Sequence, residues 1–118
     1  MSGKDILEFD DRSYEDVVVP EWPSMVRIRS LSLADRFKVE SLASANPTPE
    51  TSTTFHATLV QLSCCNGDGN LLFAPEDIPA LTTKNQMALE RIFWAAIRLN
   101  KMRAEDVEEL KRNFTSAP

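Results

Sequence analysis

The stretch YEDVVVPEWPSMVRIRSL, residues 14–31, separates this chain from an all-helical protein. Two runs rich in valine or isoleucine flank Pro-Glu-Trp-Pro, and in the second run Val26 and Ile28 alternate with arginines. This alternation is typical of a strand with one covered face. Because prolines cannot donate hydrogen bonds to a β ladder, the two prolines confine the turn and leave Trp22 at its tip. The stretch therefore predicts a β-hairpin.

Helical signals follow the hairpin. Ser32 is placed to cap a helix that begins at Leu33 and ends near Asn46. Two prolines and several hydroxyl residues then predict a loop over residues 46–53. A short helix is expected from Thr54, with a narrow apolar stripe formed by Phe55, Leu59 and Leu62.

The segment CCNGDGNLLFAPEDI, residues 64–78, raises three alternatives: a calcium loop, a thiol site or a turn. An EF-hand loop needs glycine at its sixth position and glutamate at its twelfth, but with Gly69 sixth the twelfth residue is Pro75. With Asn66 first, Leu71 takes the glycine position, so both registers fail. Two adjacent cysteines and one histidine are too few for a zinc site. We expect a metal-free turn and reduced, partly buried cysteines that pack as small apolar residues.

A second helical region follows this turn. Pro75 suits the first turn of a helix, which is expected to be brief because Pro79 follows. Thr83 and Gln86 form a capping box for the longest expected helix, residues 84–102. Its apolar residues cover a broad arc that predicts the core-facing side: Leu89, Ile92, Phe93, Ala95, Ala96 and Leu99.

These elements predict a single domain of the α+β class, mostly α with a small N-terminal β-hairpin. A chain of 118 residues fits one domain with one modest core. Residues 1–15 are acidic and are expected to form a flexible arm, whereas residues 16–118 form the domain. In residues 103–114 the acids precede the basic residues, which predicts a short terminal helix. We expect the core to depend on Phe73, Leu89, Phe93 and Leu110.

Charge and composition exclude several classes of function. The formal net charge of −5 argues against an electrostatic grip on nucleic acid. No apolar run approaches the roughly 20 residues of a membrane helix, and the first residues have no signal-peptide pattern, so we expect a cytoplasmic protein. The sequence pairs no nucleophile with a base and contains no phosphate-cradling loop, and the lone His56 is expected to be structural or solvent-facing. It therefore predicts neither an enzyme nor a bound cofactor.

The long expected helix carries a candidate contact surface. Met87 and Trp94 are seven positions apart, so they lie on nearly one line, between basic residues and opposite the core arc. Aromatic and arginine side chains are enriched at contact hot spots. The alternative is that both residues cover a neighbouring helix or the hairpin. The expected partner-binding surface consists of Trp22, Met87, Arg91, Trp94 and Arg98.

Four segments follow one another in a distinctive order: VVVPEWPSMVRIRSLSLADRF, NGDGNLLFAPEDIPAL, ALERIFWAAIRLNKM and EDVEELKRNF. In this order, across roughly residues 16–118, the chain resembles the tail assembly chaperones of phages with long flexible tails. The most specific pieces are Val-Pro-Glu-Trp before an alternating strand, Asp-Gly-x-x-Leu-Phe before Glu-Asp-Ile, and Asp-Val-Glu-Glu-Leu-Lys-x-Asn. The chain departs from the family at Pro23, where glycine is usual, and at Arg103, where serine or threonine is usual.

The resemblance implies a small cytoplasmic protein without enzymatic activity. Members of the family are thought to bind the tape-measure protein, a very long helical protein that sets tail length, and to help tail tube subunits assemble around it. By this resemblance the chain is the shorter of two products of a frameshifted gene. The resemblance, together with the proline-bounded hairpin and the acidic arm, which can reach a neighbouring copy, predicts a homo-oligomer in the form of a ring or short spiral. Two alternatives remain: a structural tail or connector subunit that stays in the particle, and a small regulatory adaptor of the antitoxin or inhibitor type.

Overall fold

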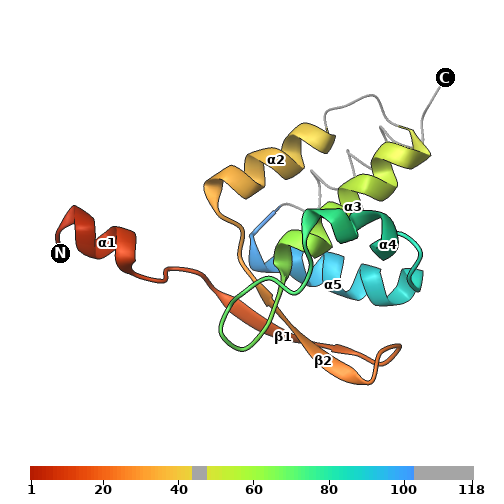
Figure 1. Ribbon diagram of the computed structural model, residues 1–118, viewed down its shortest axis with the longest axis horizontal. Helices are drawn as coiled ribbons and strands as arrows, with labels where there is room; N and C mark the ends of the chain where they lie inside the picture. The colour runs from red at the N-terminus through yellow and green to blue at the C-terminus, as the bar shows by residue number, and fades with distance from the viewer. Residues whose placement is uncertain (44–47, 103–118) are drawn as a thin grey trace.

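The computed structural model describes residues 1–43 and 48–102. A hairpin of two strands lies against a group of helices, and one short helix projects from the N-terminal end (Figure 1). This arrangement confirms the predicted α+β fold with a small N-terminal hairpin. The elements are α1 (Gly3–Glu8), β1 (Tyr14–Val19), β2 (Ser24–Arg29), α2 (Leu33–Ala43), α3 (Pro49–Ser63), β3 (Cys64–Cys65), the 3₁₀ helix η1 (Pro75–Asp77), α4 (Ile78–Leu81) and α5 (Gln86–Leu99).

The hairpin forms as the alternation predicts. Strands β1 and β2 pair antiparallel, with Val17 opposite Val26 and Val18 opposite Met25. One face is buried and the other is exposed, because successive side chains of a strand point to opposite sides. The turn closes where the main-chain N–H of Trp22 donates to the carbonyl of Val19 over 3.0 Å. The buried face consists of Val17, Val19, Val26 and Ile28.

A third strand, β3, extends the sheet beyond the predicted hairpin. Cys64 pairs with Ile28 and Cys65 with Arg27, so the sheet order is β1-β2-β3. Both cysteines are free and fully buried rather than partly buried as predicted, and they pack as small apolar residues. Burial raises the pKa of the Cys64 thiol to about 12. A two-residue strand has no periodicity of its own, so the sequence pattern could not reveal it.

Helix α3 begins five residues earlier than predicted. The expected loop over residues 46–53 is wrong from Thr48 onward, because Thr48 caps a helix that starts at Pro49. The Thr48 hydroxyl accepts the N–H of Thr51 over 3.1 Å, and the Thr51 hydroxyl oxygen accepts the N–H of Thr48 over 2.8 Å. Proline is favoured at the first helical position, where its missing N–H costs nothing. The proline and hydroxyl residues taken as loop signals are therefore a helix start.

Helix α5 is capped by a different residue from the one predicted. Asn85 is the N-cap, and its side-chain oxygen accepts the N–H of Met87 over 2.8 Å. Thr83 instead donates its hydroxyl to the carbonyl of Ala80 in the preceding turn. At 14 residues α5 is shorter than the 15-residue α3, so the prediction of the longest helix is also wrong.

The helical phase predicted for α5 is correct at its centre. Ile92, Phe93, Ala95 and Ala96 are buried as expected, whereas Leu89 and Leu99 are half-buried at the edges of the arc. Of the four residues named for the core, Phe93 is fully buried, and Phe73 and Leu89 pack against the core while half-buried. Leu110 lies outside the described residues, as does the terminal helix expected over residues 103–114.

The predicted cap of α2 is confirmed. The Ser32 hydroxyl accepts the N–H of Asp35 over 3.1 Å, and the helix starts at Leu33. Its predicted end near Asn46 lies outside the described residues. Val39 and Ala43 face the core, whereas Leu33 and Phe37 are largely exposed.

The helical region after the glycine turn (residues 67–70) is brief, as predicted, but it extends past Pro79. Pro75 begins η1 as expected, but Pro79 does not end the helical region. Pro79 occupies the first turn of α4, where a proline is tolerated, and α4 continues to Leu81. Helix α4 then packs against α3.

Candidate interaction groove

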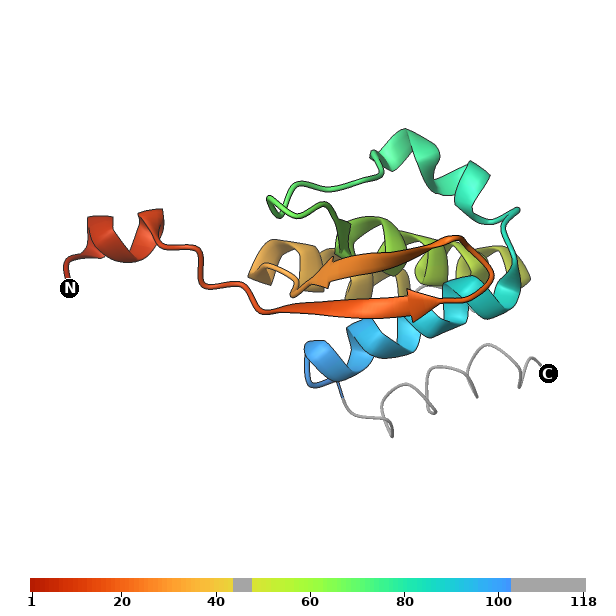
Figure 2. The same ribbon diagram turned by 90° about the horizontal axis from the view of Figure 1, so that it is seen from below.

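Four of the five residues predicted to bind a partner line one shallow groove between β1 and α5. The groove has a volume of about 440 Å³. We call it the β1–α5 groove, and its lining residues are Val17, Val18, Met87, Glu90, Arg91, Trp94 and Arg98. Figure 2 shows α5 running alongside β1 over much of the length of the strand.

The helical wall of the groove follows from sequence spacing. Met87, Arg91, Trp94 and Arg98 are separated by four, three and four positions, which places them on one face of a helix. The buried face of α5 lies beside this line and packs against α3 and the sheet. The same helix therefore supplies part of the core and one wall of the groove.

The apolar part of the groove has a buried base and exposed edges. Val17 is buried and Trp94 is half-buried, with its ring edge-on to Phe93 at 5.3 Å between centroids. Met87 and Val18 are 58% and 64% exposed. The prediction that both Met87 and Trp94 project away from the core is therefore correct only for Met87, because Trp94 packs against the core.

Ion pairs join the hairpin to α5 beside the groove. Arg91 donates two hydrogen bonds to the carboxylate of Glu21, over 2.8 and 3.1 Å. This contact lowers the pKa of the Glu21 carboxyl and raises the pKa of the Arg91 guanidinium. Arg98 approaches Glu15 at a longer 3.9 Å, and its side chain is 67% exposed. The charge of Arg91 is thus engaged within the chain, whereas that of Arg98 also faces solvent.

Trp22 does not line the groove. It is half-buried and packs against the core from the turn between β1 and β2, next to Glu21. Its neighbour Glu21 forms the ion pair with Arg91 of α5. The structure therefore brings together Met87, Arg91, Trp94 and Arg98 and leaves Trp22 apart.

Sequence reasoning missed the strand side of the groove. Val18 could be assigned to the uncovered face of the hairpin, since it lies between two valines of the opposite face. The choice of α5 as the neighbour of β1 depends on contacts between residues far apart in the chain, and no local pattern encodes it. Glu15 and Glu21 were missed for the same reason.

The glycine turn after β3 is stabilised by hydrogen bonds within residues 66–70. The side-chain oxygen of Asn66 accepts the N–H groups of Asp68 and Asn70 over 2.9 and 3.0 Å. Gly69 has φ +86°, which favours glycine. Within residues 1–43 and 48–102, no group of three or more histidine, cysteine or acidic side chains is placed to hold a metal ion.

His56 is held by neighbouring groups. Its Nδ1 lies 2.9 Å from the carbonyl oxygen of Ser52, and its ring stacks on Phe93 with 4.1 Å between centroids. It also borders a hollow of about 200 Å³ that Lys84 and Glu90 help to line.

Comparisons with known proteins bear on the fold. No family model matches the chain, and no curated protein matches it. A solved structure of the tail assembly chaperone of bacteriophage HK97 matches with a TM-score of 0.63 and 17% sequence identity. The match covers 81% of this chain and 90% of that one.

The chain has the fold of a phage tail assembly chaperone. At this low identity the likeness concerns the fold, and it agrees with the family that the ordered sequence segments resemble. In the part of the chain that the structure describes, no helix is both long and apolar enough to span a membrane.

Proposed function

We propose that this protein is a phage tail assembly chaperone, a cytoplasmic protein of the bacterial host without enzymatic activity. In this role it binds the tape-measure protein and promotes assembly of the tail tube. The observation that carries the proposal is the fold shared with the HK97 tail assembly chaperone over nine-tenths of that protein. The four ordered sequence segments support the same conclusion independently of the fold.

The β1–α5 groove is our candidate for the client surface. A long helical client presents apolar side chains at helical spacing, and such helices bind in apolar grooves. The groove offers Val18 and Met87 as accessible apolar edges, and the half-buried Trp94 also lines it. Arg98 adds a cation that can meet an acidic side chain of the client. Its volume lies within the range of about 300–1,000 Å³ that is usual for binding pockets.

The test is co-expression with a tape-measure fragment. We expect Met87→Ser to reduce co-purification of the fragment and the amount that remains soluble, because Met87 is an exposed edge of the groove. Leu33→Ser is the control, since Leu33 is also exposed but lies on α2. Trp94→Ala is less informative alone, because it also removes packing against the core. Equal capture by both variants and the wild type would contradict the client site.

Two further measurements separate the proposed role from its alternatives. A chaperone is absent from purified virions, whereas a structural tail or connector subunit remains in them. A regulatory adaptor binds one compact partner and is captured equally well from cells that lack the tape-measure gene. Capture of tail tube subunits together with the tape-measure protein would support a role in tube assembly.

A further inference from the structure

The hollow that His56 borders is a second surface of the molecule, separate from the surface assigned to the client. It has a volume of about 200 Å³ and is lined from α3, from α5 and from the connection between α4 and α5. We call it the α3–α5 hollow. Glu90 lines both the hollow and the β1–α5 groove, so the two surfaces share this residue. Its lining includes Thr53, Ala57, Thr82, Lys84, Leu89 and Glu90.

Part of the lining is apolar and is held in place by the core. Ala57 is buried, and Leu89 is half-buried and packs against the core. The ring of His56 is fixed by its stacking on Phe93, with 4.1 Å between centroids. A short hydrocarbon chain can therefore be covered by walls that exist before a ligand binds.

The threonines of the lining can only accept hydrogen bonds from a ligand. The Thr53 hydroxyl donates to the carbonyl of Pro49 over 2.7 Å, and the Thr82 hydroxyl donates to the carbonyl of Pro79 over 2.6 Å. A hydroxyl has one hydrogen and two lone pairs, so each of these oxygens keeps only lone pairs for a further partner. The threonines therefore favour a ligand that donates.

Glu90 adds a carboxylate to these acceptors. It is half-buried, and its Oε1 accepts the side-chain N–H of Gln86 over 3.2 Å. An ionised carboxylate accepts about four hydrogen bonds, so further capacity remains. Within residues 1–43 and 48–102, no lysine, arginine or histidine side chain forms an ion pair with Glu90. A cation bound beside it would supply that opposite charge.

We propose that the α3–α5 hollow binds an alkylammonium ion, with the ammonium group at the Glu90 carboxylate and the hydrocarbon stem against Ala57 and Leu89. An ammonium group has three donors and no acceptor, which matches a lining rich in acceptors. A cavity of about 150 Å³ holds benzene, so a hollow of about 200 Å³ has room for a stem of four carbons. Lys84 is exposed on the same lining and competes as a like charge.

The side chain of a lysine and a free alkylamine share this chemistry, since both carry an ammonium group on a hydrocarbon stem. Because Glu90 lines both surfaces, a client in the β1–α5 groove can extend a lysine into the hollow; this source rests on the proposed function. A free amine reaches the hollow without a client.

Titration of the full chain with n-butylammonium chloride tests the site, because this ion has the stem and the ammonium group of lysine. We expect saturable changes in the NMR shifts of the Ala57, Thr53 and Thr82 methyl groups. The neutral n-butanol is the control for the stem alone, and inorganic phosphate is the anionic probe. The absence of saturable changes, or equal changes with n-butanol, overturns the proposal. Saturation by phosphate in place of butylammonium also overturns it, because the hollow would then be an anion site at Lys84.

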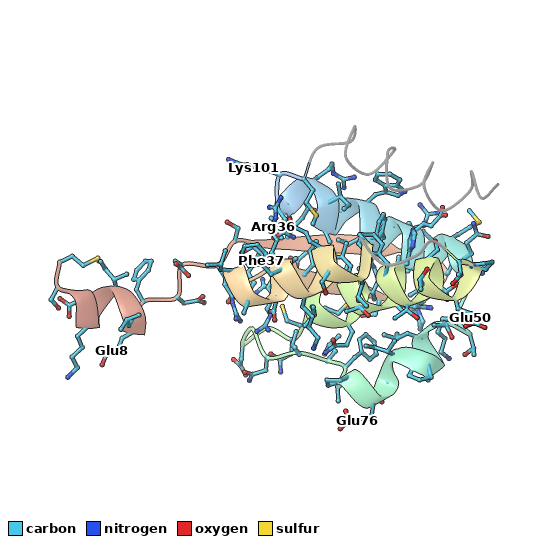
Figure 3. The ribbon with its side chains drawn as sticks, turned by 90° about the horizontal axis from the view of Figure 1, so that it is seen from above. Glu8, Arg36, Phe37, Glu50, Glu76 and Lys101 are labelled. Carbon is cyan, nitrogen blue, oxygen red and sulfur yellow. The ribbon has the colours of Figure 1, made fainter. Side chains whose placement is uncertain are left out.

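Two substitutions of charged lining residues should act in opposite directions. We expect Glu90→Gln to weaken butylammonium binding about tenfold, because it keeps the shape and removes the charge. Lys84→Gln should strengthen binding, because it removes the competing cation, and Lys84 is exposed, so its replacement leaves the packing unchanged. Glu76→Gln is the control, since Glu76 is exposed on η1 and Figure 3 shows it pointing away from the body. Equal affinity of Glu90→Gln and the wild type, or weaker binding by Lys84→Gln, overturns the proposal.

Capture of a tape-measure fragment identifies the source of the ammonium group. If a lysine of the client fills the hollow, Lys84→Gln captures more fragment, and n-butylammonium chloride lowers capture by the wild type more than equal sodium chloride does. If a free amine is the ligand, neither changes capture while the titration still saturates. Both results uphold the alkylammonium site and assign its source. A wild type that binds butylammonium but captures no fragment contradicts the proposed function alone, since the titration needs no client.

Discussion

Phe93 connects most of the aromatic contacts of the core. Its ring lies edge-on to Phe55 and Trp94 and stacks on His56, and its side chain is 1% exposed. The helical phase of α5 predicted this burial from sequence, because the surrounding apolar residues recur with the period of a helix. The aromatic partners could not be predicted, since Phe55 and Phe93 belong to helices far apart in the chain.

Truncation of Phe93 should therefore be severe. We expect Phe93→Ala to lower the free energy of unfolding by about 3–5 kcal/mol, because it removes buried contacts and leaves a cavity. Urea denaturation measures the change. Leu89→Ala is the control, since Leu89 is only half-buried and should cost less. An unchanged midpoint for Phe93→Ala would show that its ring does not fill the core.

The two glycines of the turn after β3 should respond differently to a methyl group. Gly69 has φ +86°, and a Cβ there would lie 2.7 Å from the Tyr14 hydroxyl oxygen. A Cβ at Gly67 would have no heavy atom within 4 Å apart from its own residue and its two chain neighbours. We expect Gly69→Ala to destabilise the fold by at least about 1–2 kcal/mol, the cost of left-handed backbone in a residue with a side chain. Thermal melting of both variants measures this, and an equal effect of Gly67→Ala would refute the account.

The ion pair between Arg91 and Glu21 should make stability depend on pH in the acidic range. The arginine lowers the folded-state pKa of the Glu21 carboxyl, so the stabilisation is present above the unfolded-state pKa and is lost as the pH falls through the folded-state pKa. We expect the difference in melting temperature between wild type and Glu21→Gln to shrink between about pH 6 and pH 3. Glu76→Gln is the control, because Glu76 is exposed on η1. A difference that grows on acidification would contradict this linkage.

Local sequence was sufficient to predict where α2 starts, but it was not sufficient for the starts of α3 and α5. The Ser32 cap was predicted because serine directly precedes an apolar run. The starts of α3 and α5 were misplaced because each has two or more residues able to cap within a few positions. Tertiary packing chooses among such candidates, and the residues buried in α3 set its position more strongly than its caps.

Thr48 and Thr83 provide a matched test of which residues cap α3 and α5. We expect Thr48→Ala to cost about 0.5–2 kcal/mol, because it removes the side-chain cap of α3. Thr83→Ala should cost less, since Thr83 does not cap α5 and is exposed. Chemical denaturation of the two variants under the same conditions measures the difference. A larger loss for Thr83→Ala would favour the cap predicted from sequence.

The whole molecule divides into a packed domain and a projecting arm. Periodicity was sufficient to predict the hairpin, the dominance of helices and one wall of the groove. Strand β3 and the packing of β1 against α5 required the folded structure. The flexibility expected of residues 1–15 stays a prediction, although the structure shows a capped helix within them.

Removal of the arm should leave the domain intact. We expect deletion of residues 1–9 to keep the melting temperature within a few degrees of the wild type, measured at low concentration, because these residues are exposed and none of α1 is buried. A large drop would show that the arm packs on its own domain. Far-ultraviolet circular dichroism of the same variant checks that the remaining helices are retained.

The packing of β1 against α5 also constrains the order of folding during synthesis. Strand β1 begins at Tyr14, whereas α5 ends at Leu99, so the partners that cover the hairpin emerge late. A two-stranded hairpin alone is at best marginally stable in water. Growing chains that stop before Gln86 therefore leave the valine face of the hairpin without its α5 cover. The domain becomes stable only when nearly all of its residues have been translated, so truncated products should be cleared by proteases rather than accumulate as partly folded species.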